Sequence, residues 1–226
     1  MTPERRRRSA GVSTPPTPLL LALSCLWLAA AAAAARPAPA SSSSSSSDAA
    51  VSFVKSWCAG TEYPSLCNAT LLPYAAAVGS SPAKLSWAAL TETLGGARAA
   101  KAAMEAMASG GHLAPMGAEA ARDCVSMLGD SEDLLQQAAD AMARLGKQQN
   151  KGQAASGSRE EKFQVDSVQT WASAALTNDD MCVEGFKAEA AGGGGVREAV
   201  RGHLAGVSHL TANALGIVNA MAKQIP

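Results

Sequence analysis

Apolar residues recur at helical spacing through most of the chain beyond residue 80. The clearest stripe falls at alternating steps of four and three residues, at Val196, Val200, His203, Val207, Leu210, Ala214, Ile217 and Met221. Three earlier stretches have related patterns, at Leu90, Leu94, Ala97 and Met104, at Leu128, Leu135 and Met142, and at Val168, Ala172, Ala175, Asp179, Cys182 and Phe186. Such spacing places one face of a helix against a core. The pattern therefore predicts four long amphipathic helices.

Glycine- and proline-rich segments separate these stretches. The breaks lie at residues 79–82, 110–115, 146–157 and 192–195. The chain after about Asp48 is poor in aromatic and β-branched residues and rich in alanine, leucine, methionine and glutamine, which favours helices over strands. Short connections between long helices are typical of an up-down-up-down bundle. We therefore expect an all-α fold, with a four-helix bundle over residues 80–226 and a shorter helical part over 49–79.

The first forty residues have the layout of a secretory signal peptide. Arg5 to Arg8 form a basic region, and an apolar run over 19–35 ends in small residues. We expect cleavage between residues 35 and 40, with an uncleaved membrane anchor as the alternative because the run is just long enough to span a bilayer. The serine run that follows predicts a flexible leader over 41–48.

Charge and catalytic motifs exclude several classes of protein. Removing residues 1–40 takes away five of the 19 basic and one of the 19 acidic residues, which leaves a net charge of −4. This charge predicts no basic surface for binding nucleic acid or an anionic membrane.

The sequence also lacks the usual catalytic residues. The chain has three histidines and no recognisable nucleophile motif. The adjacent carboxylates Asp179 and Asp180 do not converge on a helix, and we interpret them as surface or turn residues near a kink. His203 is interpreted as a core or edge residue rather than a pH sensor. The sequence thus predicts neither an enzyme nor a cofactor.

Four cysteines remain once Cys25 leaves with the signal peptide: Cys58, Cys67, Cys124 and Cys182. An even number in an oxidising compartment indicates disulfides, for which three connectivities exist. A bridge between Cys58 and Cys67 would pin two short helices as a hairpin, and one between Cys124 and Cys182 would tie the second and third bundle helices. The chain has no C-x-x-C motif and no histidine at ligand spacing, so a metal site is not expected.

The segments around these cysteines carry a resemblance. They read WCAGTEYPSLC at residues 57–67, DCVSMLGDSEDLL at 123–135 and WASAALTNDDMCVEGF at 171–186. In this order and behind a signal peptide, they resemble the plant invertase and pectin methylesterase inhibitor family over nearly the whole chain after the leader. The resemblance implies a helical hairpin over a four-helix bundle, with bridges between the first and second and between the third and fourth cysteines.

The resemblance also implies an interface. Asp130 and Asp133, six and nine residues after the third cysteine, and Glu184, two after the fourth, match acidic positions of the family's contact surface. From spacing alone these three carboxylates form a solvated helix face. The family often has a hydroxyl residue before the fourth cysteine, whereas this chain has Met181, which removes a polar contact.

Three functions follow as hypotheses. The first is a secreted, apoplastic inhibitor that binds non-covalently over the pectin-binding cleft of plant pectin methylesterase and so restrains cell wall de-esterification. The second is an inhibitor of cell wall or vacuolar acid invertase, and the third is a helical carrier of a small apolar ligand. The pro-region of a methylesterase is disfavoured because the chain stops at Pro226.

The sequence also contains a possible modification site. Asn68 begins a glycosylation sequon.

Overall fold

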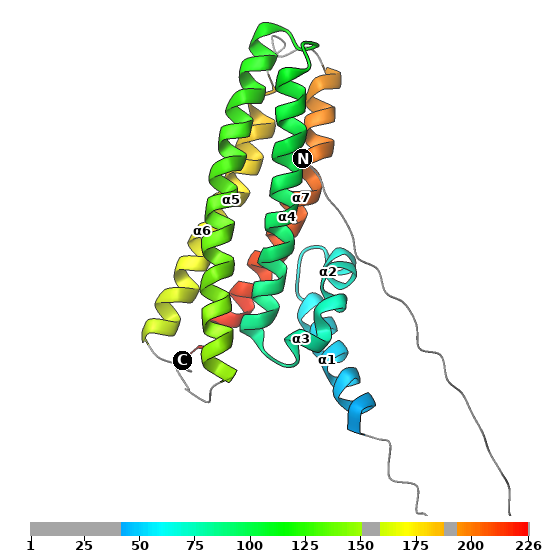
Figure 1. Cartoon of the computed structure of the whole chain (residues 1–226), viewed down its shortest axis with the longest axis vertical. Helices are drawn as coiled ribbons and strands as arrows, with labels where there is room; N and C mark the ends of the chain where they lie inside the picture. Colours follow the sequence, from blue (N-terminus) through cyan, green and yellow to red (C-terminus); the bar gives the residue numbers. More distant parts are fainter. Residues whose placement is uncertain (1–41, 151–158, 188–193, 226) are drawn as a thin grey trace, which may run out of the picture. The chain divides into compact units, whose positions relative to one another are not determined.

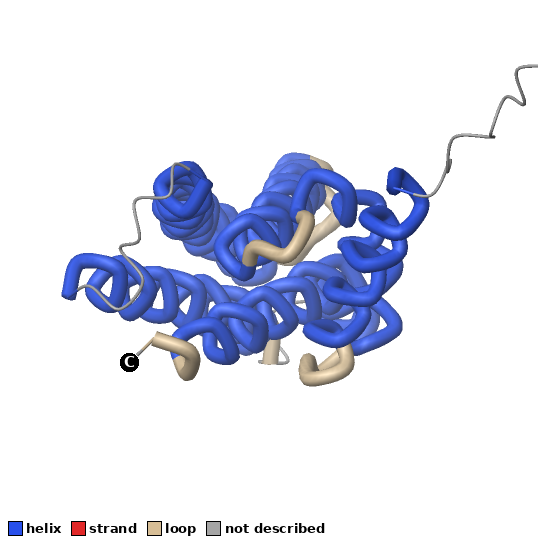
Figure 2. Tube along the Cα trace, turned by 90° about the horizontal axis from the view of Figure 1, so that it is seen from below, coloured by secondary structure: helices blue, strands red, loops and turns tan. Residues whose placement is uncertain are grey.

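A computed structural model describes residues 42–150, 159–187 and 194–225, and every regular element in this part of the chain is helical (Figure 1). The elements are α1 Ser42–Cys58, α2 Pro64–Leu71, the 3-10 helix η1 Leu72–Tyr74, α3 Ala75–Val78, α4 Pro82–Ser109, α5 Pro115–Asn150, α6 Arg159–Glu184 and α7 Gly194–Ala222. Seen from below, the described chain consists of helices and connecting loops, with no strand (Figure 2). The expected signal peptide over residues 1–40 lies outside the described residues.

The four long helices form the expected bundle. Each packs against its neighbours in the sequence, and α7 returns to pack against α4. Successive helices are connected by short segments and run side by side (Figure 1). The all-α fold and the up-down-up-down order are confirmed.

Capping and turn residues explain where α4 begins and ends. The hydroxyl of Ser81 accepts a hydrogen bond from the backbone N–H of Lys84 at 3.3 Å, and Pro82 occupies the first turn, where its missing N–H costs nothing. After the helix ends, Gly111 adopts a φ of +67°, which a residue without a side chain reaches readily. The predicted break between the first two bundle helices therefore depends on a glycine in a left-handed conformation.

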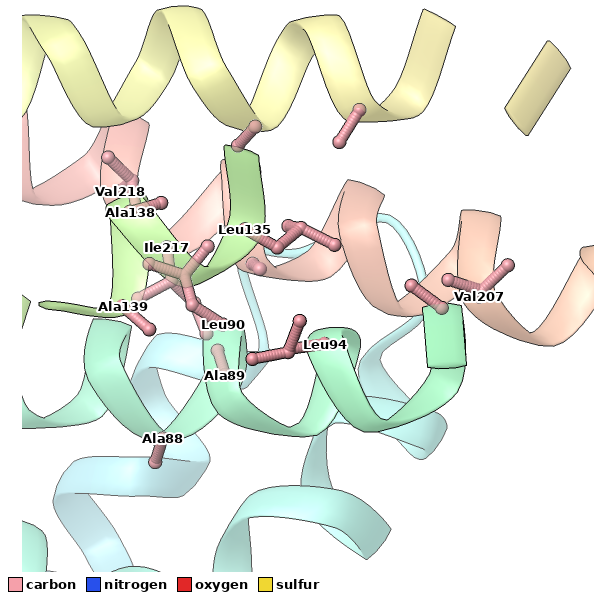
Figure 3. Close-up of a cluster of buried hydrophobic side chains, with 14 of the residues drawn as sticks. Ala88, Ala89, Leu90, Leu94, Leu135, Ala138, Ala139, Val207, Ile217 and Val218 are labelled. Carbon is pink, nitrogen blue, oxygen red and sulfur yellow. The ribbon is translucent and has the colours of Figure 1, made fainter. Parts of the chain in front are cut away.

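The core is built from leucine, valine and many alanine side chains. Figure 3 shows Leu90 and Leu94 of α4 facing Leu135 of α5 and Ile217 of α7. Gly96 allows α4 and α7 to approach closely, since a Cβ at this position would stand 3.2 Å from the Cδ1 atom of Leu210. Small residues at such contacts let the helices pack at the density of a protein interior.

One stripe position of α7 is wrong in the sequence interpretation. His203 is exposed, and the adjacent Leu204 is 1% exposed and takes the core position. Residues three and four apart both lie on one helix face, so a step of three and a step of four from Val200 fit the same pattern. His203 is therefore a surface residue.

The N-terminal helices form a unit held by the first disulfide. Cys58 and Cys67 are bonded, with 5.5 Å between their Cα atoms. The side-chain amide of Asn213 in α7 accepts from the N–H of Tyr63 at 2.8 Å and donates to its carbonyl at 3.0 Å. The Tyr63 ring also stacks on His209, with 3.9 Å between ring centroids. These contacts attach the hairpin to the last bundle helix.

The start of α1 also differs from the expectation of a flexible leader over residues 41–48. Helix α1 begins at Ser42, so most of the serine run is helical rather than flexible. Extending an existing helix costs much less than starting one, and serine has only a modest penalty in a helix. The buried residues Ala50 and Val54 of α1 supply the packing to which this extension is joined. No helix among the described residues is long and apolar enough to cross a membrane.

Candidate functional site

The second disulfide fixes α5 against α6. Cys124 and Cys182 are bonded with 4.7 Å between their Cα atoms, as the family resemblance implied. One turn further along, the side chain of Asn178 donates to the backbone carbonyl of Met127 at 3.3 Å. The hydroxyl of Ser131 then donates to a backbone carbonyl of α6, also at 3.3 Å. These links set the two helices antiparallel in a fixed register.

Asp130 and Asp133 are exposed on the outside of α5. Among the described residues, neither carboxylate takes part in an ion pair, whereas the neighbouring Glu132 pairs with Lys101 of α4 at 3.5 Å. Residues three apart on a helix are surface neighbours. The two aspartates therefore form a local negative charge that the rest of the described chain does not neutralise.

Glu184 lies at the end of α6 and is also exposed, but it pairs with Lys187. It stands two residues beyond Cys182, and Asp130 stands six beyond Cys124. Because α5 and α6 are antiparallel, these offsets add, and the two carboxylates are separated by roughly 12 Å along the bundle axis. The three predicted interface residues thus lie along one pair of helices and do not form a single cluster.

A groove between α5 and α6 occupies part of this separation. It has a volume of about 240 Å³, and its lining includes Met116, Met127 and Met181 together with Glu119 and Asp123. Met116 is 56% exposed and Met181 is 51% exposed, which is unusual for large apolar side chains. Sequence reasoning missed the two acidic residues, although Asp123 lies seven residues before Asp130 and hence on the same helix face.

We call this surface the α5–α6 face. It consists of Met116, Glu119, Asp123, Met127, Asp130, Asp133, Met181 and Glu184. Flexible methionine side chains adapt to differently shaped partners, and carboxylates give orientation and specificity. Such a surface is suited to binding a protein with basic and apolar groups, without any chemical reaction.

The burial of Asp179 also differs from the sequence interpretation. It was expected at the surface near a kink, but α6 continues to Glu184 and Asp179 is only 1% exposed. Burial, helped by the nearby Asp180 carboxylate, raises the pKa of Asp179 to about 7, although the Thr211 hydroxyl lowers it. Neither oxygen of Asp179 makes a hydrogen bond within the described chain, and Thr211 donates to the carbonyl of Val207 at 2.8 Å.

The predicted glycosylation residue lies in the N-terminal part. Asn68 lies in α2, and its side-chain nitrogen donates to the carbonyl of Pro64 at 2.9 Å. Its glycosylation remains a prediction. No group of three or more His, Cys, Asp or Glu side chains in the described part of the chain is placed to hold a metal ion.

Comparison with known proteins identifies relatives. The family model "Plant invertase/pectin methylesterase inhibitor" matches residues 52–217. The chain is 36% identical over 174 residues to "Pectinesterase inhibitor 10" of Arabidopsis thaliana, covering 76% of this chain and 52% of that protein. It therefore spans about half the length of that relative. The chain is also 30% identical over 175 residues to "Pectinesterase inhibitor 11" of the same species, covering 77% of this chain and 83% of that protein.

A solved structure has the same fold. It is a crystal structure of a mutant pectin methylesterase inhibitor from Arabidopsis, with a TM-score of 0.52 and 20% sequence identity, and the match covers 72% of this chain and 92% of that chain.

Proposed function

Because the chain belongs to the plant invertase/pectin methylesterase inhibitor family, we propose that it is a secreted protein inhibitor of pectin methylesterase. The match of the family model to residues 52–217 carries this proposal. The family consists of inhibitors rather than enzymes. The expected signal peptide supports a location outside the cell, in the apoplast or cell wall.

The α5–α6 face supports a binding mode in which the inhibitor covers the enzyme's pectin-binding cleft. A cleft that binds a polyuronide needs basic and aromatic groups, and the exposed carboxylates of Asp130 and Asp133 complement the basic ones. Both aspartates stand on a long helix that a disulfide joins to its neighbour. A rigid surface loses little conformational freedom on binding, so more of the contact energy contributes to affinity.

Met181 adds an apolar element to this binding mode. The residue lies in the groove beside Met116 and Met127 and replaces the hydroxyl residue that the family often has there. An exposed thioether gains free energy when a partner covers it. Met181 therefore favours a target isoform that presents an apolar side chain at this position.

Pectin methylesterase is favoured over acid invertase as the target by the named relatives. The family includes inhibitors of both enzymes, but both relatives described above are named pectinesterase inhibitors. Invertase inhibition is the second candidate function because the fold and the four cysteines suit either branch.

A parallel titration tests the proposal. The purified, oxidised protein is added in increasing amounts to a plant pectin methylesterase and to an acid invertase at mildly acidic pH. We expect stoichiometric loss of methylesterase activity and unchanged invertase activity. Loss of invertase activity alone would retain the family and overturn the target. Full activity of several methylesterase isoforms and of invertase would overturn the proposed function.

A further inference from the structure

A cavity lies where the N-terminal hairpin meets the bundle, away from the α5–α6 face. It has a volume of about 380 Å³ and is lined by Ala77 and Val78 of α3, Lys84 and Trp87 of α4, and Met142, Ala143, Gly146 and Lys147 of α5. This volume is within the range of small-molecule sites, which is about 300 to 1,000 Å³. The cavity is therefore large enough for a small organic ligand.

The walls of the cavity are apolar and fixed. Val78 is 2% exposed and Met142 is fully buried, so both are held by the core behind them. Trp87 is half-buried and contacts the ring of Tyr74 edge-on, with 6.4 Å between centroids. A preformed apolar wall with an aromatic side is the usual lining of a ligand site.

Two cations provide the polar part of the cavity. Within the described chain, neither Lys84 nor Lys147 takes part in an ion pair. The stem of Lys84 crosses α5 at Gly146, where a Cβ would stand 3.1 Å from its Cγ atom. This contact holds the stem against α5, the helix that also carries Lys147. The lining contains no acidic residue that would compete for the two ammonium groups.

We propose that this cavity binds a small carboxylate with an apolar body. The carboxylate lies between the ammonium groups of Lys84 and Lys147, which provide charge-assisted hydrogen bonds. The apolar body lies against the half-buried ring of Trp87 and gains free energy from the burial of apolar surface. A fully hydrophilic anion would not make this second contribution, so the site distinguishes amphipathic carboxylates from inorganic anions.

Binding at this position also joins two parts of the fold. Residues of α3 belong to the N-terminal hairpin, and residues of α4 and α5 belong to the bundle. A ligand that contacts both is bound only when the hairpin is docked, so it stabilises the docked state by mass action. Thermal unfolding therefore gives a readout that is independent of enzyme inhibition.

Octanoate is a suitable probe, and octanamide is its uncharged match. Calorimetric titration should show that octanoate binds more tightly than octanamide. The double variant Lys84→Gln/Lys147→Gln should weaken octanoate binding at least about tenfold, the loss expected when both charged partners are removed. A control variant, Lys55→Gln/Lys223→Gln, removes the same charge from exposed positions outside the cavity and should bind octanoate like the unmodified protein.

Two further measurements locate the ligand. Octanoate should change the tryptophan fluorescence of the unmodified protein, and Trp87→Phe should abolish that change. The unfolding temperature should rise with octanoate and should not rise in the Lys84→Gln/Lys147→Gln variant. Equal octanoate affinity in the cavity variant and the control variant would overturn the proposal. The absence of binding at concentrations below the micelle-forming range would also overturn it.

Discussion

Carboxylates occupy two contrasting regions of this molecule. On the α5–α6 face, Asp130 and Asp133 are exposed and have no ion pair among the described residues. In the bundle interior, Asp179 is 1% exposed and its oxygens lack hydrogen bonds within the described chain. The first pair is unneutralised but hydrated, whereas the buried residue has lost its hydration. Hydration determines which of them affects the stability of the fold.

Because of this difference, the exposed carboxylates should affect binding, and the buried carboxylate should affect the stability of the fold. An exposed carboxylate is hydrated in the free protein, so its charge contributes little to folding and is available to a partner. A buried carboxylate without partners disfavours its own ionisation, so the pKa of Asp179 rises to about 7. At mildly acidic pH, Asp179 is therefore a neutral acid within the core. Changes on the face should alter inhibition, and changes at Asp179 should alter the pH dependence of unfolding.

The largest effect is expected from Asp179→Asn. Its folded-state pKa is about 7 and its ordinary value is 3.8, so between these values the folded protein retains a proton that the unfolded chain has lost. The free energy of unfolding therefore falls as the pH rises through this window. The pKa difference corresponds to about 4 kcal/mol, which is fully lost above neutral pH. Asp179→Asn should remove this decline and be more stable than the unmodified protein at pH 8.

Denaturant unfolding of both proteins across this pH range measures the effect. The neighbouring Asp180→Asn is the control, because Asp180 is exposed and should keep most of the decline. An equal slope for Asp179→Asn and the unmodified protein would show that Asp179 is not the residue responsible.

Charge reversal on the α5–α6 face should have the next largest effect. We expect Asp130→Lys/Asp133→Lys to weaken methylesterase inhibition at least about tenfold, because attractive contacts with basic groups become repulsive. The helical content and the free energy of unfolding should remain nearly unchanged, since both side chains are exposed. Inhibition constants and circular dichroism measure the two properties separately.

A matched control separates local contact from overall charge. Asp48→Lys/Glu105→Lys makes the same change in net charge at exposed positions of α1 and α4, outside the α5–α6 face. It should inhibit nearly as well as the unmodified protein. Undiminished inhibition by Asp130→Lys/Asp133→Lys would place the interface elsewhere on the bundle.

The bundle could be predicted from the sequence because its signals are repeated. Stripes at steps of three, four or seven recur in four stretches, and glycine or proline marks each break, as at Gly111 and Pro82. Local errors occurred where one rule allowed two answers. His203 and Leu204 fit the same spacing, and only the packing of α7 decides which of them is buried. The start of α1 was missed because composition alone does not reveal a helix that extends from a packed segment.

The site was less predictable because it depends on contacts between helices. The resemblance supplied Asp130, Asp133 and Glu184, but the sequence did not indicate that Lys187 pairs with the last of these. The groove at Met181 requires α5 and α6 in register, which is set by a disulfide between distant residues. Asp179 kept the step of the α6 stripe, and its periodicity was a better guide to burial than its polarity.

The smallest effect is expected from Thr211→Val. The Thr211 hydroxyl is the group that lowers the pKa of Asp179, although burial outweighs it. Without this hydroxyl, the pKa should rise above about 7, and the decline in stability between pH 4 and pH 8 should exceed that of the unmodified protein by less than about 1 kcal/mol. Thr93→Val is the matched control, since both residues are fully buried and each donates to the carbonyl four residues earlier. Carbon-detected NMR titration of Asp179 should show a higher pKa in Thr211→Val only. An equal rise in both variants would attribute the effect to general loss of polarity in the core rather than to the Thr211 hydroxyl.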